Sequence, residues 1–306
     1  MTKPNLLIVG SIGLDTIETS STRVDRVLGG AACYAACSSS HFTPSAIVGV
    51  VGDDFPEEHE KMLLSKSIDL TCLEKTPGKT FFWHGRYEED MNNRETLDTQ
   101  LGVFAEFSPK IPESHASMPF LFLANIHPQL QLDVLDAMKG DPLTAADTMN
   151  LWIDTTPDLL KKVIKRVDVM FINDDEARMI TGQTTIPRAA ESIMKMGPKT
   201  AVIKRGDAGA MIFCQDEVFC VPAIPITAND PTGAGDTFAG GMMGYIAKQG
   251  ELTAQTVRQA AVLGTVMASY TVEDFSLNRL ATINATDIQN RIERIRQLSA
   301  FDPISL

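Results

Sequence analysis

The chain has 306 residues, with 27 lysines and arginines against 39 aspartates and glutamates, so its formal net charge is −12. Apolar residues make up 44% and charged residues 22%, which is the composition of an ordinary globular protein and excludes a disordered or fibrous one. The negative charge argues against nucleic acid or an anionic membrane surface as the main partner, because both are bound through clustered lysine and arginine. At this length we expect one domain spanning 1–306.

The five cysteines show neither a C-x-x-C pair nor a spacing that completes a zinc site with histidine. Cys33 and Cys37 lie four residues apart, so a helix would place both on one face, as small buried side chains. The first apolar run ends at Gly10 and is too short for a signal peptide, and no run is long enough to span a membrane. We therefore expect a soluble, cytoplasmic protein in a reducing compartment.

Buried strands and amphipathic helices alternate along most of the chain. Short apolar runs bounded by glycine, aspartate or asparagine predict strands at 6–9, 46–51, 120–123, 151–153, 169–172, 201–203 and 211–213. The intervening patterns predict helices at 57–65, 130–138, 157–166, 176–181 and 187–196. This alternation indicates parallel βαβ units, and so a three-layer α/β/α fold with a mostly parallel central sheet.

Two segments, 15–28 and 80–100, break this rhythm because polar and apolar residues alternate in them with a period of two. A turn is expected at 90–93, between the two halves of the second segment. Half-buried strands of this kind predict a small separate β-sheet inserted in the domain. The alternation places Trp83 and Gly85 on one face of that sheet, and His84 and Arg86 on the other.

The most informative segment is the turn Asp-Pro-Thr-Gly-Ala-Gly-Asp at 230–236, which precedes a predicted helix. Backbone N–H groups of Gly233, Ala234 and Gly235 would gather at the helix N-terminus, where unpaired donors and the helix dipole favour an anion. Asp236 falls in the first turn. A carboxylate there can simply cap the helix, or it can take a proton from a hydroxyl held beside the anion.

This turn is neither a Walker P-loop nor a dinucleotide-binding G-x-G-x-x-G fingerprint. It resembles the C-terminal signature of the ribokinase-like (PfkB-type) carbohydrate kinases. Three other strings resemble motifs of that family and follow in its order: Leu-Gly-Gly-Ala-Ala at 28–32, Asn-Asp-Asp-Glu at 173–176 and Lys-Arg-Gly-Asp-Ala-Gly-Ala at 204–210. The resemblance implies a single ribokinase-like kinase domain in which the alternating segments 15–28 and 80–100 form a lid.

The resemblance also implies the reaction and its cofactors, ATP and Mg²⁺. Asp236 would be the catalytic base, and the turn 233–235 would be an anion hole for the transferred phosphoryl group. Asn173 and Glu176 would face one largely water-coordinated Mg²⁺, although an ordinary acidic helix N-terminus explains this pair equally well. Whether a monovalent cation such as K⁺ binds beside the anion hole stays open.

Further residues would bind the nucleotide, near its phosphates or its base. The residues that the resemblance implies for this role are Lys204, Gly206, Gly209, Thr232, Gly264 and Thr265.

On the acceptor side, Asp15 matches the family's sugar-binding aspartate, and Gly29 and Gly30 would let the backbone approach the substrate. Tyr34 stands where the family usually has asparagine, which departs from the pattern for ribose or fructose. Arg86 on the lid is a further candidate for substrate binding. One lid face would close over the substrate and the other would pack against a second subunit, giving a homodimer.

The leading hypothesis is an ATP-dependent kinase acting on the hydroxymethyl group of a neutral sugar or sugar-like molecule. A nucleoside kinase of the same fold is the alternative, motivated by Tyr34 and the aromatic lid. A non-catalytic binding relative is a third hypothesis, and Asp236 argues against it because a pure binder needs no base. The acidity of the chain favours a neutral acceptor over a phosphorylated one.

Overall fold

The computed structural model describes residues 4–89, 91, 94–215, 217–302 and 304. Its centre is a nine-stranded sheet in the order β13-β12-β11-β10-β9-β8-β1-β4-β5. The strands are β1 (Leu6–Val9), β4 (Ser45–Val51), β5 (Leu73–Lys75), β8 (Phe120–Leu123), β9 (Leu143–Ala146), β10 (Val169–Asn173), β11 (Thr200–Lys204), β12 (Ala210–Cys214) and β13 (Glu217–Val221). Strands from β5 to β11 are parallel, and β12 and β13 continue the sheet antiparallel, so the expected mostly parallel sheet is confirmed.

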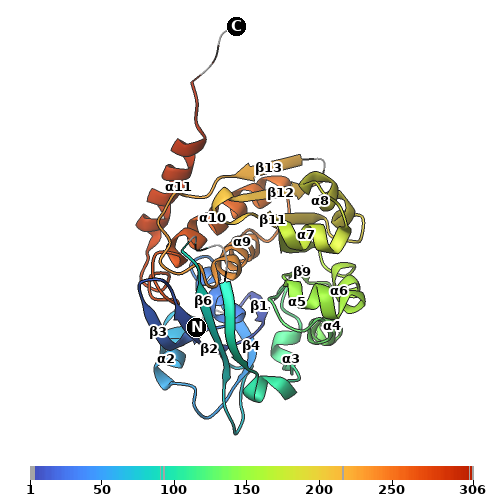
Figure 1. The fold of residues 1–306 in the computed structure, drawn as a ribbon. Coiled ribbons are helices and arrows are strands. Elements are labelled where there is room, and N and C mark those ends of the chain that lie inside the picture. The colour runs from blue at the N-terminus through green and yellow to red at the C-terminus, as the bar shows by residue number, and fades with distance from the viewer. Residues whose placement is uncertain (1–3, 90, 92–93, 216, 303, 305–306) are drawn as a thin grey trace.

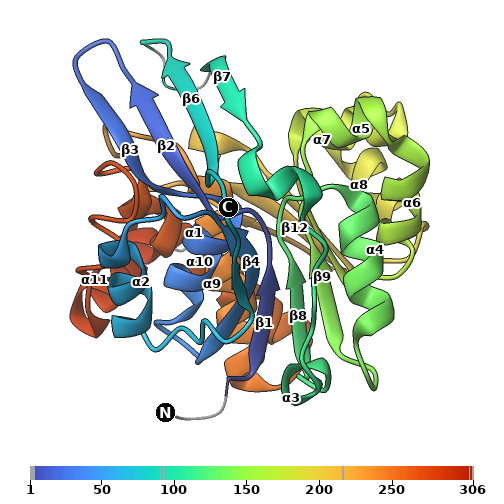
Figure 2. The same ribbon diagram turned by 90° about the horizontal axis from the view of Figure 1, so that it is seen from below.

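Helices cover both faces of this sheet and complete three layers (Figure 2). One face carries α1 (Ala31–Ser39), α2 (Glu57–Ser65), α9 (Ala234–Gln249), α10 (Ala254–Thr271) and α11 (Ala285–Ser299). The other carries α4 (Pro128–Ala137), α5 (Asn150–Thr155), α6 (Pro157–Ile164), α7 (Asp174–Thr181) and α8 (Ile186–Met194). Short turns of helix fill the connections at η1 (Gly102–Glu106), α3 (Glu113–Ala116) and η2 (Gly206–Ala208). The described helices include none that is both long and apolar enough to cross a lipid bilayer.

The strand expected at 151–153 is wrong. These residues lie inside α5, where Ile153 is buried and Leu151 is 45% exposed, as expected for one turn of an amphipathic helix. The strand of this βα unit is β9, whose sequence Leu-Thr-Ala-Ala is too weakly apolar to stand out. The five predicted helices all exist, with ends that agree within two residues.

A second sheet of four strands projects from the main body (Figures 1 and 2). Its order is β3-β2-β6-β7, formed by β2 (Gly13–Glu18), β3 (Arg23–Gly29), β6 (Phe81–Tyr87) and β7 (Arg94–Gln100). The central pair β2–β6 is parallel and the outer pairs are antiparallel. The small separate sheet predicted from 15–28 and 80–100 is therefore present, and we call it the lid sheet. The turn expected at 90–93 lies, apart from Met91, outside the described residues.

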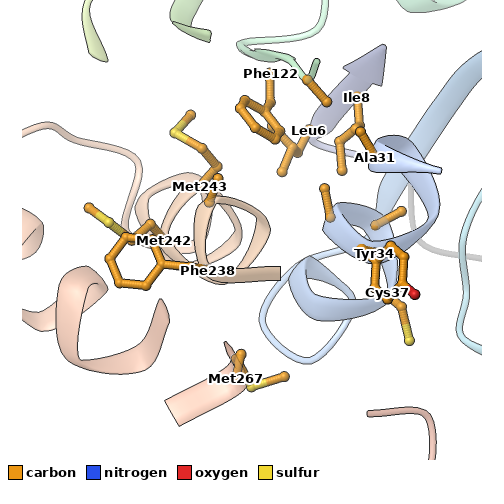
Figure 3. Packing of buried hydrophobic residues seen from close by; sticks show 14 of the residues in the cluster. Leu6, Ile8, Ala31, Tyr34, Cys37, Phe122, Phe238, Met242, Met243 and Met267 are labelled. Atoms are coloured by element: carbon orange, nitrogen blue, oxygen red, sulfur yellow. The ribbon is translucent and has the colours of Figure 1, made fainter. Parts of the chain in front are cut away.

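Close packing of α9 on α1 joins the C-terminal part of the chain to the N-terminal part (Figure 3). A Cβ on Gly240 would come within 2.3 Å of the Ala35 carbonyl oxygen, so only glycine permits this approach. The Ser38 hydroxyl donates a hydrogen bond to the Thr237 carbonyl at 2.7 Å across the same contact. The glycines within α9 thus bring the helix against α1, which fixes the position of its N-terminus.

Candidate active site

Polar side chains gather where neighbouring parallel strands end. Asp147 follows β9, Asn173 ends β10 and Lys204 ends β11, with Asn173 and Lys204 directly opposite in the ladder. Asn125 follows β8 in the same way. In open α/β sheets ligands bind at the carboxyl ends of the strands, so this edge is the expected place for a site.

A cavity of about 970 Å³ opens at this edge. Its walls come from the strand ends, the first turn of α9, the inner side of α10, the segment 223–229 and the two tips of the lid sheet. The residues of the sequence-based site that line it are Asn173, Glu176, Lys204, Gly206, Gly209, Gly233, Ala234, Gly235, Asp236 and Thr265.

The N-terminus of α9 rests on an aromatic ring. Gly233 caps the helix with φ +72°, and a Cβ there would lie 2.4 Å from carbons of the Tyr34 ring, so both its conformation and its packing require glycine. The Ala234 N–H donates to the Pro231 carbonyl at 3.2 Å, which shapes the turn. The first-turn amides of a helix lack intrahelical partners, so this end of α9 can receive an anion from the cavity.

Lys204 and Asp147 form a buried ion pair beside that helix end. The Lys204 Nζ lies 2.5 Å from the Asp147 Oδ2, with side chains 18% and 3% exposed. A Cβ on Gly235 would lie 3.3 Å from the same Nζ, which places the ammonium against the first turn of α9. Burial opposes its charge, but Asp147 and then Glu176 more than offset this, and the pKa of Lys204 is raised. Lys204 is therefore a fixed cation beside the end of α9 that can receive an anion.

Asp236, in the first turn of α9, faces the cavity and is only partly exposed. Desolvation, followed by the charge of Asp147, raises the pKa of its carboxyl to about 7, while Lys204 and Arg94 pull the other way. A carboxyl that exchanges its proton near neutral pH is suited to act as a general base.

Asn173 and Glu176 form a capping box at the start of α7. The Glu176 N–H donates to Asn173 Oδ1 at 2.8 Å, and the Asn173 N–H donates to Glu176 Oε2 at 2.7 Å. The helix-capping explanation therefore holds, yet Glu176 also lines the cavity, and burial raises its pKa to about 7. A carboxyl kept from ionising by burial gains from a nearby cation.

These residues fit a Mg²⁺ ion whose ligands are mostly oxygen atoms of water and phosphate. Within the described ranges no three His, Cys, Asp or Glu side chains gather closely enough to enclose a metal ion. Magnesium commonly takes one or two carboxylates and fills its remaining positions with water and substrate phosphates. The oxygen donors at Glu176 and Asn173 suit that mode of binding.

The residues expected to bind the acceptor lie outside the cavity lining, on the lid-sheet strands β2 and β3 and at α1. Asp15 on β2 is 4% exposed, and a Cβ on Gly29 would overlap its carboxylate, so Gly29 makes room for Asp15. Gly30 caps α1 with φ +94°. Burial, then Asp230 and Asp236, raises the pKa of Asp15 to about 8. Tyr34 is 1% exposed, and its hydroxyl finds no hydrogen-bond partner among the described residues.

Three further residues of the sequence-based site lie outside the cavity lining. The Thr232 hydroxyl donates to the Tyr87 hydroxyl at 3.0 Å beneath the α9 turn. Gly264 permits α10 to approach the Phe238 carbonyl on α9. Arg86 is 53% exposed and binds Glu18 through two hydrogen-bonding nitrogens, away from the cavity.

Two charged residues were missed by sequence reasoning. Asp147 follows β9, a strand that the sequence pattern does not reveal. Arg94 lines the cavity from β7, while Arg86 was chosen as the lid arginine. The alternation in 80–100 separates the two faces but does not say which of them points inward.

Known proteins are similar to this chain in sequence and in fold. The profile of the pfkB family carbohydrate kinases matches residues 5–281. A cytidine kinase from Thermococcus kodakarensis is 33% identical over 260 residues, which cover 79% of this chain and 88% of that enzyme. A nucleoside kinase from Methanothermobacter thermautotrophicus is 25% identical over 321 residues, covering 98% of each chain.

Solved structures give the same result for the fold. A putative ribokinase II from E. coli, solved in complex with ATP and Mg²⁺, superposes with a TM-score of 0.78 at 17% identity, covering 95% of this chain and 99% of that one. The nine-stranded sheet with its separate four-stranded sheet is thus the ribokinase-like fold. Because the family profile matches nearly the whole chain, this chain is a kinase and belongs to the pfkB family of carbohydrate kinases.

Proposed function

We propose that the protein transfers the γ-phosphoryl group of ATP to the hydroxymethyl group of a neutral nucleoside. The observation that carries the reaction is Asp236, a carboxyl with a pKa of about 7 at the anion-binding end of α9, facing a cavity wide enough for two substrates. The choice of a nucleoside over a free sugar is supported by the 33% identity to a cytidine kinase across most of that enzyme.

In the proposed reaction Asp236 accepts the proton of the acceptor hydroxyl. The acceptor oxygen then forms its bond to the γ-phosphorus as the bond from phosphorus to the ADP oxygen breaks, and the proton later leaves Asp236 for solvent. Lys204 and the amides at 233–235 stabilise the negative charge on the phosphoryl oxygens. Bound Mg²⁺, held on the Glu176 side, would supply further neutralisation of phosphate charge.

The acceptor would be oriented by Asp15, whose carboxylate can accept hydrogen bonds from sugar hydroxyls, with Gly29 making room for that carboxylate and Gly30 for the Ser11 carbonyl. Tyr34, on α1, offers a buried hydroxyl that has no hydrogen-bond partner among the described residues. The proposed nucleotide site includes Gly206, Gly209 and Thr265, which line the cavity, while Thr232, Gly264 and Arg86 stay predictions from the sequence.

We further propose that K⁺ supports activity from the turn 230–232. Asp230 is fully buried there, and its carboxylate accepts N–H groups of Thr232 and Ser276 while retaining lone pairs. Activity in K⁺ that exceeds activity in Na⁺ at equal ionic strength would agree with this. A homodimer through the lid sheet and a cytoplasmic location, the latter in keeping with five free cysteines, stay predictions, and sedimentation equilibrium tests the first.

The decisive experiment is an ADP-release assay with ATP, Mg²⁺ and a panel of cytidine, uridine, adenosine, inosine, ribose and fructose. Turnover with a nucleoside and little with a free sugar is expected. Turnover only with free sugars would contradict the nucleoside assignment and restore the sugar kinase hypothesis. ATP binding without ADP formation for any acceptor would instead favour a non-catalytic relative.

A further inference from the structure

Polar contacts attach the C-terminal helix α11 to the end of α10. The two helices pack against each other (Figure 1), and the buried side chains of α11 are Ile288 and Ile295. Two buried isoleucines hold a helix of 15 residues only weakly, so its position also depends on polar contacts. The Tyr270 hydroxyl on α10 donates to the Asp287 carbonyl of α11 at 2.8 Å. The Arg291 side chain of α11, which is 17% exposed, reaches α10 from the other direction.

The Arg291 guanidinium contacts three residues at the end of α10. Its Nη1 donates to Ser269 Oγ at 2.7 Å, and its Nη2 donates to Glu273 Oε1 at 2.5 Å, just after the helix. Its carbon lies 4.0 Å from the centre of the Tyr270 ring, well within cation–π range. Because the guanidinium is planar and rigid, it fixes the relative positions of Ser269, Tyr270 and Glu273.

The same end of α10 forms part of the wall of the cavity, and Ser269 belongs to that wall. The apolar side chains that line this part of the cavity are Ile224, Ile226, Ala268, Val272 and Phe275. An apolar wall with an aromatic side chain suits the flat base of a nucleotide. In the proposed function the phosphates would lie elsewhere in the cavity, with Lys204 and the amides at the start of α9.

Glu273 links this wall to the segment that precedes α9. Its backbone carbonyl accepts a side-chain N–H of Asn229 at 2.7 Å, and the Val272 carbonyl accepts the Asn229 backbone N–H at 2.8 Å. The carboxylate of Glu273 is held by Arg291 and, at 3.4 Å, by Arg279. Asn229 also lines the cavity, so a displacement of Glu273 would move two parts of its wall, the end of α10 and the segment at Asn229.

We propose that Arg291 is a positioning residue for nucleotide binding, which holds the end of α10 and Asn229 at the separation that the nucleotide base requires. This inference rests on the proposed use of ATP. Arg291 itself is not part of the cavity wall, so it acts through Ser269 and Glu273. Loss of its guanidinium should therefore weaken the binding of the base and leave phosphate binding and phosphoryl transfer unchanged.

The test compares Arg291→Met and Arg291→Lys with the matched control Arg296→Met. Arg296 lies on the same helix, is 73% exposed and pairs with Glu293 within that helix. We expect Arg291→Met to raise the Kd of ATP about 10-fold, because it removes two hydrogen bonds from a charged group. At saturating ATP, kcat should change by less than about twofold. Arg291→Lys, which keeps the charge and loses the fork of N–H groups, should lie between, and Arg296→Met should resemble the unaltered protein.

Inorganic tripolyphosphate separates the base wall from the phosphate site, because it has the phosphates of ATP and no base. ATP and tripolyphosphate, each with Mg²⁺, are titrated into every variant by calorimetry in the absence of acceptor. We expect Arg291→Met to bind tripolyphosphate as tightly as the unaltered protein does, while ATP binds about 10-fold more weakly. A substitution that merely loosened the domain would weaken both ligands. Urea unfolding checks that each variant is folded, and if Arg291→Met does not fold, Arg291→Lys provides the same comparison.

A double-mutant cycle with Glu273→Gln tests the route through Glu273. If Arg291 acts by holding Glu273, the two substitutions together should weaken ATP binding by less than the product of their separate effects. An unchanged Kd of ATP in Arg291→Met overturns the role of Arg291, and so does equal weakening of ATP and tripolyphosphate. A fall in kcat at saturating ATP with unchanged ATP affinity also overturns it. Absence of ADP formation by the unaltered protein with every acceptor contradicts the proposed function instead, and the titrations, which need no acceptor, still decide the role of Arg291.

Discussion

Lys204 and Asp147, 57 residues apart in the chain, are joined by a 2.5 Å ion pair at the carboxyl ends of β11 and β9. The other Asp147 oxygen accepts the Thr148 N–H at 2.9 Å. The buried Gln131 side chain donates to the carbonyls of Leu123 and Asp147, which ties the ends of β8 and β9 together. The cation at the end of α9 is thus held by an acid whose own backbone is fixed.

Replacing Asp147 by Asn should destabilise the fold and slow the reaction, because it leaves Lys204 buried without its counter-charge. Breaking one partner of a buried pair costs about 3–5 kcal/mol, whereas removing both charges is often close to neutral. We therefore expect Asp147→Asn to lower the free energy of unfolding in urea, and the double variant Asp147→Asn/Lys204→Met to recover most of it. Equal stability of the single and double variants would contradict this coupling.

Asp236→Asn should abolish the base while leaving the anion site intact. We expect kcat to fall by about 10²–10⁴-fold, the usual contribution of a positioned general base, with ATP affinity nearly unchanged. Isothermal titration with a non-hydrolysable ATP analogue measures the ATP affinity, and steady-state kinetics measure kcat. A near-normal rate in this variant would rule out Asp236 as the base.

The pH dependence of kcat/KM should show the titration of Asp236. Because the pKa of Asp236 is raised to about 7 and a base must be deprotonated, kcat/KM should rise with pH through about 7 and then level off. The charge of Asp147 raises the pKa of Asp236, so Asp147→Asn should move this limb to lower pH. If the rise of kcat/KM stays at the same pH in Asp147→Asn, it belongs to a group other than Asp236.

Asp15→Asn should stabilise the folded protein while impairing acceptor binding. The pKa of Asp15 is about 8 in the folded state against an ordinary value of 3.8, so the folded state binds the proton more tightly than the unfolded state. Stability from this group is therefore fully present below about pH 4 and is lost as pH rises to about 8. Melting temperatures should show the variant gaining more at pH 8 than at pH 5, with a raised acceptor KM. A larger gain in melting temperature at pH 5 than at pH 8 would show that folding lowers the pKa of Asp15 and does not raise it.

Gly233→Ala should be worse than Gly250→Ala, although both glycines flank α9 and have similar φ values of +72° and +81°. A left-handed alanine costs about 1–2 kcal/mol at either position. A Cβ at 233 would also overlap the Tyr34 ring, whereas at 250 it would meet no atom within 4 Å. We expect a greater loss of stability and a loss of kcat only in Gly233→Ala, measured by urea unfolding and ADP release. Equal effects of the two substitutions on stability and kcat would mean that the Tyr34 ring moves aside without disturbing the turn at Gly233.

Strong local signals made most of the fold predictable. The helical pattern at 57–65 located α2 at both ends, and buried runs located β1, β8 and β10. The strand β9 escaped because threonine and alanine carry little hydrophobic contrast, and Leu151 with Ile153 imitated a strand within one helical turn. Short elements that depend on tertiary burial leave no such pattern.

The site was predictable where it followed contiguous strings, as at 230–236 and 173–176, and not where it depends on which way the lid faces. The ladder shifts between His84 and Gly85, and inward contacts fall on Tyr87 and Arg94, while Arg86 binds Glu18 on the other side. Alternation divides a strand into two faces, but only packing against the domain decides which face meets substrate.

The contact between α1 and α9 also has a consequence for biosynthesis. The Ser38–Thr237 hydrogen bond spans 199 residues, so the surface of α1 that receives α9 is made long before its partner leaves the ribosome. Until then Tyr34 and its apolar neighbours lack their cover, and the turn at 230–236, whose Gly233 packs on that ring, has not yet been made. A nascent or truncated chain that ends before α9 is therefore inactive. Its exposed apolar surface makes it prone to aggregate and to bind chaperones. Activity therefore requires that the chain has been made at least through α9.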